Sequence, residues 1–445
     1  MPYIPATGAQ RDAMLAAIGV NSLAEFFTGI PEELRFPELP LEEGLSEPEV
    51  LRELSALAEE NTNADRFRWF LGGGLYDHFI PAAVGALASR GEFLTAYTPY
   101  QSEVSQGTLQ AIFEYQTMAA ELLGLDAANA GHYDGATALA EAALMALRNH
   151  GARTGGKPGR ILLPRGLHPE YRGVLETYLA AFDPVIETYG EHPREAAASA
   201  GDLACLIAAY PDFFGIIPEL NGAAGAVHER GGLFIIQADP VFLGLCKSPG
   251  EWGADIAVAE GQSLGNDLNY GGPGLGIMAA KAELTRRLPG RIAGEARDNR
   301  GRRGFVLTLA AREQHIRREK AVSNICSNQG LAMLRSCIYL ALMGKRGLRE
   351  AAELCWHKSH YAAARLGALP GFSVPEKPFF KEFTLTLPGR AGEASAKLRE
   401  KGIVPGLPLS RYWPDRDREL LVCVTEKNSR RDIDELVTAL GEVFL

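Results

Sequence analysis

His315 is the side chain in this sequence whose chemistry is easiest to name. It lies in the polar stretch that begins at Arg312, two residues after Glu313. An imidazole near neutral pH can act as a general base, and charged neighbours can tune it for that role. The sequence shows no nucleophile for it to activate. We therefore favour a hydrogen-bonded structural histidine and keep general-base catalysis as the alternative.

A second candidate site is defined by an aspartate and by a lysine that is missing. An apolar run from Leu233 ends at Asp239, a second apolar run covers residues 256–258, and a Gly-rich turn follows at residues 271–276. This pattern resembles the core of fold-type-I pyridoxal-phosphate (PLP) enzymes. The resemblance implies that the aspartate holds the pyridinium nitrogen and that a lysine after the second strand forms the Schiff base. The position expected for that lysine is occupied instead by Gln262, Ser263, Leu264 and Gly265.

The segment from His132 to Ala138 predicts the start of a helix and allows two interpretations. Small residues at a helix N-terminus expose backbone N–H groups, which bind the PLP phosphate in fold-type-I enzymes. Asp134, however, can cap the same N–H groups, and its carboxylate would repel a phosphate dianion. We favour capping. The glycines at Gly72-Gly73-Gly74 lack the Gly-Lys-Ser/Thr of a phosphate loop, so we expect a flexible turn there.

Length and composition limit the class of protein. The chain has 445 residues, 46% hydrophobic and 22% charged, as expected for a globular protein with room for more than one core. Its net charge of -10 argues against general nucleic-acid binding. Residues 1–10 show no signal-peptide pattern, and no apolar run approaches the roughly 20 residues of a membrane span. We expect a cytoplasmic protein that binds neither membranes nor nucleic acid.

The spacing of the cysteines predicts buried, reduced thiols rather than a metal or redox centre. Six are present, without CxxC spacing and mostly in apolar surroundings. Such residues are typically buried and reduced. We expect no metal site. The residues are Cys205, Cys246, Cys326, Cys337, Cys355 and Cys423.

The first 65 residues are expected to form an arm rather than a domain. Short helical patterns cover residues 11–20 and 21–27, prolines then favour an extended stretch, and Ser46 can cap a further helix. An arm this thin cannot bury a core of its own. It is expected to lie across the large domain or across a partner chain.

Residues 66–343 are predicted to form a large α/β domain with a mainly parallel sheet. Near-continuous apolar runs are typical of parallel strands covered on both faces, and helical patterns lie between some of them. A helix from about Gly107 to Leu123 precedes these runs, and Gly124 is expected to end it. The predicted strands are residues 161–163, 203–209, 233–236 and 256–258, with an antiparallel strand at 275–279.

Residues 344–445 are predicted to form a small α+β domain. A boundary is expected near residues 344–347, followed by a linking helix over 348–366. Strands at 379–387 and 420–424 and helices at 393–401 and 429–444 complete this domain.

The stretch from Arg286 to Arg303 is rich in arginine and glycine. We expect a solvated loop, as for most basic runs. An acidic partner or a substrate carboxylate is the alternative, because the arginine guanidinium matches the geometry of a carboxylate.

Several motifs spread over nearly the whole chain agree with one another. They are Thr98-Pro99-Tyr100-Gln101 with Ser105-Gln106-Gly107, Phe113 to Met118, Tyr133 to Ala138, Arg312 to Arg318 with Ser323 to Cys326, and Lys401-Gly402-Ile403 with Val424-Thr425-Glu426. Together they resemble the glycine dehydrogenase (decarboxylating) P-protein family of the glycine cleavage system, in its subunit 1 form.

This resemblance implies an oxidoreductase of glycine catabolism built from two kinds of chain, expected as an α2β2 heterotetramer. Subunit 2 is expected to carry PLP on its lysine. The complex decarboxylates glycine and passes the aminomethyl group to the lipoyl group of the H-protein. This chain is then expected to hold no PLP covalently, to be inactive alone and to support the partner's active site. Asp239 becomes a vestigial structural acid.

The resemblance makes the polar, Tyr-rich loop that starts at Tyr97 the main candidate for a contribution across a subunit interface. An equal alternative is that it only packs between subunits. Two further hypotheses stay open: a stand-alone PLP enzyme that uses another lysine, such as Lys247 or Lys281, and a purely structural subunit. The candidate interface or substrate-lining residues are Tyr97, Thr98, Tyr100, Gln101, Glu103, Arg312 and His315.

Overall fold

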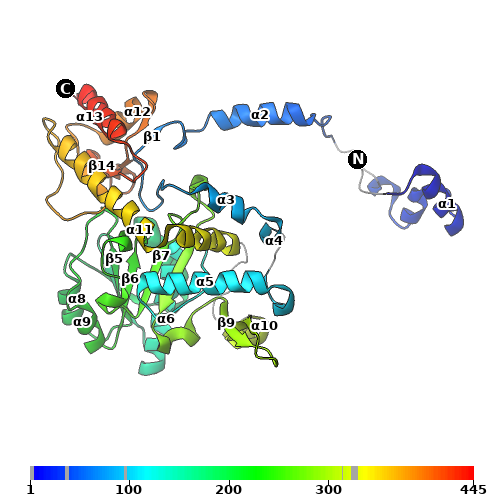
Figure 1. Cartoon of the computed structure of the whole chain (residues 1–445), viewed down its shortest axis with the longest axis horizontal. Coiled ribbons are helices and arrows are strands. Elements are labelled where there is room, and N and C mark those ends of the chain that lie inside the picture. The colour runs from blue at the N-terminus through cyan, green and yellow to red at the C-terminus, as the bar shows by residue number, and fades with distance from the viewer. Residues whose placement is uncertain (1–4, 36–39, 95–97, 313, 322–328, 445) are drawn as a thin grey trace. The chain divides into compact units, whose positions relative to one another are not determined.

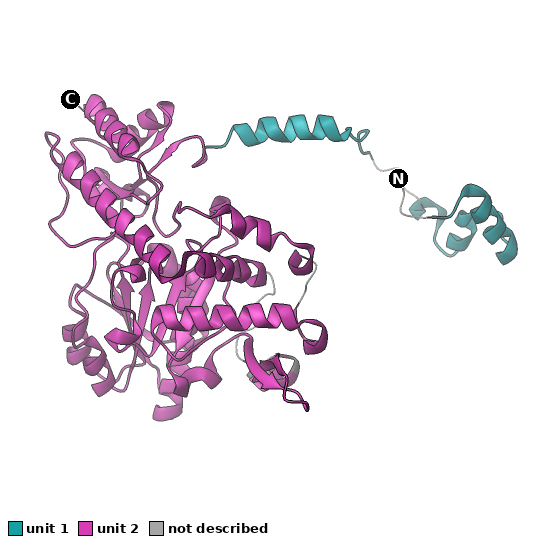
Figure 2. Ribbon diagram, viewed as in Figure 1, with its two compact units in different colours: residues 1–62 teal, residues 63–445 magenta. Residues whose placement is uncertain are grey.

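The computed structural model describes residues 5–35, 40–94, 98–312, 314–321 and 329–444. The chain divides into two compact units, residues 1–62 and residues 63–445, coloured teal and magenta in Figure 2. All residues of the candidate PLP-like site lie in the larger unit.

The first unit contains helices but almost no buried surface. Helix α1 (Gly8–Ile18), the short 3-10 turns η1 (Leu23–Phe27) and η2 (Glu32–Leu34), and helix α2 (Glu47–Glu59) follow one another along the chain. Among the described residues of this unit, only the side chain of Leu15 is buried. The predicted helices near residues 11–20 and after Ser46 are confirmed, whereas residues 21–27 form only a 3-10 turn, and the unit has no core of its own.

A seven-stranded sheet with the order β2-β8-β7-β6-β5-β3-β4 forms the centre of the larger unit (Figure 1). Strand β8 runs antiparallel to its neighbours β2 and β7, and the other neighbouring pairs are parallel. The predicted mainly parallel sheet is confirmed, with the antiparallel strand after the Gly-rich turn. The strands are β2 (Ala127–Ala128), β3 (Arg160–Pro164), β4 (Val185–Tyr189), β5 (Cys205–Tyr210), β6 (Leu233–Ala238), β7 (Ile256–Glu260) and β8 (Gly276–Ala280).

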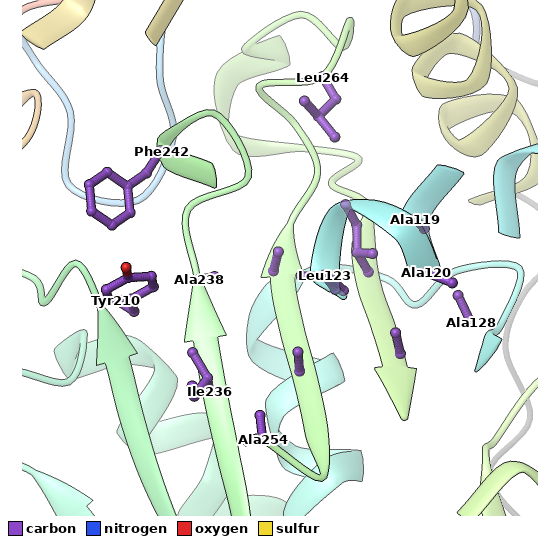
Figure 3. Close-up of a cluster of buried hydrophobic side chains, with 14 of the residues drawn as sticks. Ala119, Ala120, Leu123, Ala128, Tyr210, Ile236, Ala238, Phe242, Ala254 and Leu264 are labelled. Atoms are coloured by element: carbon purple, nitrogen blue, oxygen red, sulfur yellow. The ribbon is translucent and has the colours of Figure 1, made fainter. Parts of the chain in front are cut away.

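Helices cover both faces of this sheet. On β6, Phe234 and Ile236 pack into a core cluster with α5 and α11, whereas Ile235 packs into a second cluster with α6 and α7. Figure 3 shows part of the first cluster. Burial on both faces explains why these strands are continuous apolar runs. The helices are α5 (Gln106–Leu123), α8 (Pro193–Ser199), α9 (Ala223–Glu229) and α11 (Gln329–Gly367) on one face, and α6 (Gly135–Thr154) and α7 (Pro169–Leu179) on the other.

The long helix α11 connects the sheet to the C-terminal segment. It contains a kink at Gly344, where φ is 57° and the backbone leaves the helical region. This kink falls where the sequence predicts a domain boundary, but residues 63–445 form one compact unit, so the boundary stays a prediction. Upstream, the sequence predicts a stretch that is polar at first, around Arg312, and becomes helical through about Met343. The described residues there form only short turns and α10 (Gln314–Arg317), and residues 322–328 lie outside the described part.

The C-terminal segment has a three-stranded antiparallel sheet of order β11-β14-β13, covered by two helices. Its apolar core contains residues such as Phe383, Leu421 and Leu436. A short parallel pair, β1 with β12, joins residues 68–69 to this segment. The elements are β1 (Arg68–Trp69), β11 (Glu382–Thr386), α12 (Ala391–Glu400), β12 (Ile403–Val404), β13 (Leu407–Pro408), β14 (Glu419–Cys423) and α13 (Arg430–Phe444), with α3 (Ala82–Ala88) and α4 (Gly91–Leu94) following β1.

The basic stretch from Arg286 to Arg303 is not simply a loop. It contains β9 (Ile292–Arg297) and the start of β10 (Arg303–Thr308), which pair as an antiparallel hairpin. The sequence prediction was wrong here because the glycines and exposed arginines hide the alternation of the strands. Phe305 is buried, and Gln106 of α5 accepts a hydrogen bond from its N–H and donates one to its carbonyl oxygen (both 2.8 Å).

Within the described ranges, no helix combines the length and apolar composition that a membrane span requires. The five cysteines in these ranges carry free thiols, and Cys326 lies outside them.

Candidate functional site

Asp239, which follows β6, forms a buried ion pair with a lysine from the C-terminal segment. Its Oδ2 lies 2.6 Å from the Nζ of Lys381, and the two side chains are 9% and 2% exposed. Its Oδ1 accepts hydrogen bonds from the N–H groups of Val241 (2.9 Å) and Phe242 (3.3 Å). The charge of Asp239 is therefore already balanced by this chain's own lysine.

Lys381 is held on three sides. Besides Asp239, its Nζ donates to the Nε2 of His78 at 2.9 Å and lies 3.5 Å from the centre of the Tyr76 ring. Burial, the largest single effect, would lower the pKa of Lys381, but attraction to Asp239 together with Cys423 and Cys355 raises the pKa above its usual value. The amine is thus a fixed ammonium and a poor nucleophile. The sequence analysis missed Lys381, although two charged residues inside the run from Phe379 to Phe383 were a signal.

The hydrogen-bond network continues from His78 to Glu426. The His78 Nδ1 donates to the Glu426 carboxylate (2.7 Å), which also accepts from the Phe79 N–H (2.7 Å) and from the Cys355 thiol (3.3 Å). Burial would raise the pKa of Glu426, but His78 and these hydrogen bonds lower it to about 2. The ligand atoms of His78, Cys355 and Glu426 lie within 4.8 Å of one another, the spacing of a metal site. Burial raises the Cys355 thiol pKa, which favours a hydrogen-bonded network over metal ligation.

Glu382 explains the Gly-rich segment that the sequence predicted as a flexible turn. Its carboxylate accepts hydrogen bonds from the Gly73 N–H (2.7 Å) and the Tyr76 hydroxyl (2.8 Å). A Cβ on Gly72 would overlap the Glu382 carboxylate and lie 2.7 Å from the Cβ of Cys423. The glycines therefore allow the backbone to approach an internal carboxylate closely. This contact fixes the segment, so the expectation of flexibility was wrong.

Glu382 predicts a pH dependence of stability. Burial raises its pKa from 4.5 to about 7. The folded protein then keeps a proton that the unfolded chain loses, so this group lowers the free energy of unfolding as pH rises from about 4.5 to about 7. We expect Glu382→Gln, which retains an acceptor for Gly73, to flatten that fall. Urea midpoints measured between pH 4.5 and 7.5 would check this, and parallel profiles for the two proteins would contradict it.

Helix α6 begins at two carboxylates. Asp134 caps it by accepting from the Thr137 N–H (2.8 Å), which confirms the predicted cap. Glu260, at the end of β7, accepts from the Gly135 N–H through Oε2 (2.8 Å) and from the Gln262 and Leu275 N–H groups through Oε1 (2.9 and 3.0 Å). Burial raises the pKa of Glu260 to about 7. The sequence analysis did not single out Glu260.

The four residues at the expected lysine position, residues 262–265, are held by hydrogen bonds and by packing against neighbouring side chains. Gln262 donates to the Tyr76 carbonyl oxygen (3.1 Å) and accepts from the Tyr76 N–H (2.9 Å). Ser263 is buried, and Leu264 is fully buried in the cluster drawn in Figure 3. Gly265 has a φ of 92°, and a Cβ there would lie 2.7 Å from the Cβ of Tyr339. A long side chain would not fit at Gly265.

One small cavity connects these groups. Its free volume is about 50 Å³, enough for a few water molecules. His168 lies in its wall, with Nε2 donating to the Gly73 carbonyl oxygen (2.8 Å) and Nδ1 accepting from the Glu170 N–H (3.1 Å), and burial lowers the His168 pKa. The lining includes Tyr76, His168, Tyr171, Asp239, Glu260 and Lys381.

Two segments proposed for a subunit interface meet at the turn before β9. The Tyr100 hydroxyl accepts a hydrogen bond from the Arg291 guanidinium (3.1 Å), which also lies 5.4 Å from the centre of the Tyr100 ring. Arg312 donates to the carbonyl oxygen of the adjacent residue, Gly290 (3.0 Å). Tyr100 and Arg312 are therefore bound to two adjacent residues of this turn, and neither lines the cavity that Asp239 lines.

Of the remaining candidate interface residues, Thr98, Gln101 and Glu103 do not line the cavity either. Thr98 is half-buried, whereas Gln101 and Glu103 are exposed. Tyr97 lies outside the described residues. His315 belongs to α10 (Gln314–Arg317), but the description does not extend to its side chain.

Comparison with known proteins agrees with this architecture. The chain is 47% identical over 451 aligned positions to the probable glycine dehydrogenase (decarboxylating) subunit 1 of Desulfitobacterium hafniense, with 100% of both chains covered. It matches a crystal structure of glycine decarboxylase (P-protein) of the glycine cleavage system in inhibitor-bound form, with 44% identity, a TM-score of 0.88 and 100% coverage of both chains. The cystine C-S lyase C-DES, solved with glycine linked to its PLP cofactor, shares the fold at 15% identity, with a TM-score of 0.61 and coverage of 86% of this chain and 100% of that one. The predicted fold-type-I PLP-transferase-like architecture is confirmed. The family model for the glycine cleavage system P-protein matches residues 1–440, and the chain belongs to that family.

Proposed function

We propose that this chain is a cofactor-free subunit of a glycine decarboxylase. A partner subunit 2 holds PLP on its lysine, and together they decarboxylate glycine and transfer the aminomethyl group to the lipoyl group of the H-protein. The observation that carries the proposal is the buried Asp239–Lys381 pair in a chain similar over its whole length to subunit 1 proteins.

The cavity of this chain does not fit PLP. The ring-nitrogen partner, Asp239, is bound by Lys381, the N-terminus of α6 is occupied by Glu260, and a volume of about 50 Å³ leaves no room for a substituted ring. We therefore assign no step of the reaction to this cavity. The chemistry takes place at the partner's site, to which this chain contributes through surface residues.

The surface formed by Tyr100 and Arg312 is the part of this chain that we assign to the partner's site. Tyr100 is 57% exposed, so its ring can be covered by a second chain. Arg291 and the Gly290 carbonyl oxygen fix the two side chains against the β9–β10 hairpin. A surface held in this way can position a glycine carboxylate or a loop of subunit 2 with little loss of conformational freedom on binding.

The first unit supplies a second contact with subunit 2. Val50, Leu51, Leu54 and Leu57 on α2 are between 37% and 59% exposed, and their spacing places them along one side of the helix. An apolar stripe on a unit without a core is typical of a surface that a partner covers.

A separate surface is available for the H-protein. The arginines of the β9–β10 hairpin, including Arg297 and Arg300, are exposed and offer an acidic H-protein a docking surface.

Reconstitution tests the proposal. The chain alone should show no Schiff-base absorbance with PLP and no glycine–bicarbonate exchange, and both should appear when subunit 2 is added, with the mass of an α2β2 assembly. Exchange activity from this chain alone would refute it. In the assembled complex, Tyr100→Phe should lower turnover; unchanged turnover with intact assembly would favour the purely structural subunit.

The stand-alone PLP enzyme is less well supported. Lys281 is paired with Asp255 (2.5 Å), and Lys247 lies over the Trp252 ring (4.7 Å). Neither belongs to the residues that line the cavity, and Lys381, which does, is a paired ammonium. Borohydride reduction of the chain with PLP, followed by peptide mapping, should find no single preferred lysine.

A further inference from the structure

The cavity contains a cation and an anion at the two positions where the fold-type-I resemblance places the charged ends of PLP. Lys381 lies against Asp239, the expected partner of the pyridinium nitrogen. Glu260 lies at the start of α6, where the phosphate is expected. Both residues line the same cavity, together with Tyr171, whose hydroxyl would lie 2.5 Å from a Cβ on Gly135.

We propose that this chain keeps a latent PLP pocket that two of its own side chains hold closed, the Glu260 carboxylate in place of the cofactor phosphate and the Lys381 ammonium in place of the protonated ring nitrogen. This inference rests on the proposed function and deepens it. Loss of the lysine removes only covalent attachment, whereas Glu260 and Lys381 also exclude free cofactor. They therefore direct PLP to the partner subunit.

The hydrogen bonds at Glu260 support the proposal that its carboxylate takes the place of the cofactor phosphate. One carboxylate accepts three backbone N–H groups, from Gly135, Gln262 and Leu275, at 2.8 to 3.0 Å. Convergent backbone donors at a helix N-terminus are a typical phosphate-binding arrangement. A phosphate dianion could take these donors only if Glu260 left; Asp134, whose carboxylate is bound to the Thr137 N–H, would reduce the affinity gained but leave the three donors open.

The contacts of Lys381 support the second part of the proposal, that its ammonium takes the place of the protonated ring nitrogen. Its ammonium fills the position beside Asp239 Oδ2 and covers the face of the Tyr76 ring. A pyridinium N–H could make the same ion pair with Asp239 and the same contact with the ring. The third side of the ammonium is taken by His78, which links the pair to the network through Glu426.

Pyridoxamine 5′-phosphate is the probe for this proposal, because it has the ring and phosphate of PLP but no aldehyde to react with surface lysines. By equilibrium dialysis, the full wild-type chain should not bind it. The double variant Lys381→Ala/Glu260→Ala should bind it at least about 100-fold more tightly than the detection limit set for the wild-type chain, a factor of ten for each charge removed. Binding should also raise the melting temperature of this variant.

The single variants separate the two ends of the ligand. Glu260→Ala should gain affinity for inorganic phosphate, and Lys381→Ala should gain affinity for pyridoxamine without phosphate. The matched control is Lys377→Ala/Glu191→Ala, which removes the same two residue types from an exposed ion pair and should gain nothing. If the double variant does not fold, the single variants carry the same test.

Binding of pyridoxamine 5′-phosphate by the wild-type chain would overturn the inference, and so would a folded double variant that gains no affinity. Failure of both single variants to gain binding would have the same meaning. None of these measurements requires subunit 2 or turnover. An inactive reconstituted complex would therefore count against the proposed function without affecting this inference.

Discussion

Replacing Lys381 with methionine is expected to lower the free energy of unfolding by about 3 to 5 kcal/mol. Methionine has a similar length but no charge, so the change leaves the Asp239 carboxylate buried without a cation. It also removes the donor to His78. Urea denaturation of the full chain, followed by tryptophan fluorescence, would measure the loss.

Lys377→Met is the matched control for this change. Lys377 forms an ion pair with Glu191 at 2.5 Å, but the two side chains are 42% and 71% exposed. Exposed ion pairs contribute about 1 kcal/mol or less. If Lys381→Met costs no more than Lys377→Met, the buried pair does not stabilise the fold as described.

A double-mutant cycle isolates the charge pair. Asp239→Asn keeps an oxygen that can accept from the Val241 and Phe242 N–H groups but removes the negative charge. The double variant Asp239→Asn/Lys381→Met should therefore be more stable than Lys381→Met alone, with a coupling energy of about 2 kcal/mol or more. Additive losses would show that the two charges act independently.

The sequence was sufficient to predict the sheet because its central strands are buried on both faces. Residues 233–236 and 256–258 are apolar without interruption, and both became strands of the parallel sheet. The edge strand β4 (Val185–Tyr189) is partly exposed along its length, so it carries no comparable signal. The β9–β10 hairpin escaped prediction for the same reason.

The site was less predictable because its contacts join distant parts of the chain. Asp239 was identified from its position after β6, but Lys381 and Glu426 come from the C-terminal segment and His78 from the segment after β1. No local pattern encodes such a pairing. The charged residues Lys381 and Glu382 within an apolar strand were a signal, since charges are rarely buried unless they are paired.

The segment at residues 262–265, where the fold-type-I resemblance places a lysine, is tightly packed. At Gly265 the chain is too close to Tyr339 for any side chain, and Gln262 is bound to the backbone of Tyr76. The segment is therefore fixed by contacts that leave no room for a long side chain at Gly265. Introducing a lysine at residues 262–265 alone should not create a PLP site, because Glu260 and Lys381 line the cavity and are bound by the α6 N-terminus and by Asp239.

Gly215→Ala is expected to cost about 4 kcal/mol or more, because this glycine sets the approach of the Lys381 segment to the large sheet. Its φ is 83°, a left-handed conformation that costs an alanine about 1 kcal/mol. A Cβ there would also overlap the Glu382 carbonyl oxygen and lie 2.5 Å from its carbon. Backbone atoms cannot rotate away, so the segment has to shift and would weaken the hydrogen bond from the Phe380 N–H to the Gly215 carbonyl oxygen (3.2 Å).

The consequence should extend to the ion pair. Moving the backbone at Glu382 moves Lys381 with it, so the variant should expose the Lys381 amine to acetylation, which mass spectrometry would detect. Gly225→Ala is the control, because Gly225 lies inside α9 with no atom within 4 Å of an added Cβ. That change should stabilise the protein by up to about 1 kcal/mol. A Gly215→Ala protein with normal stability and an unreactive Lys381 would show that the segment can shift while the charge pair stays closed.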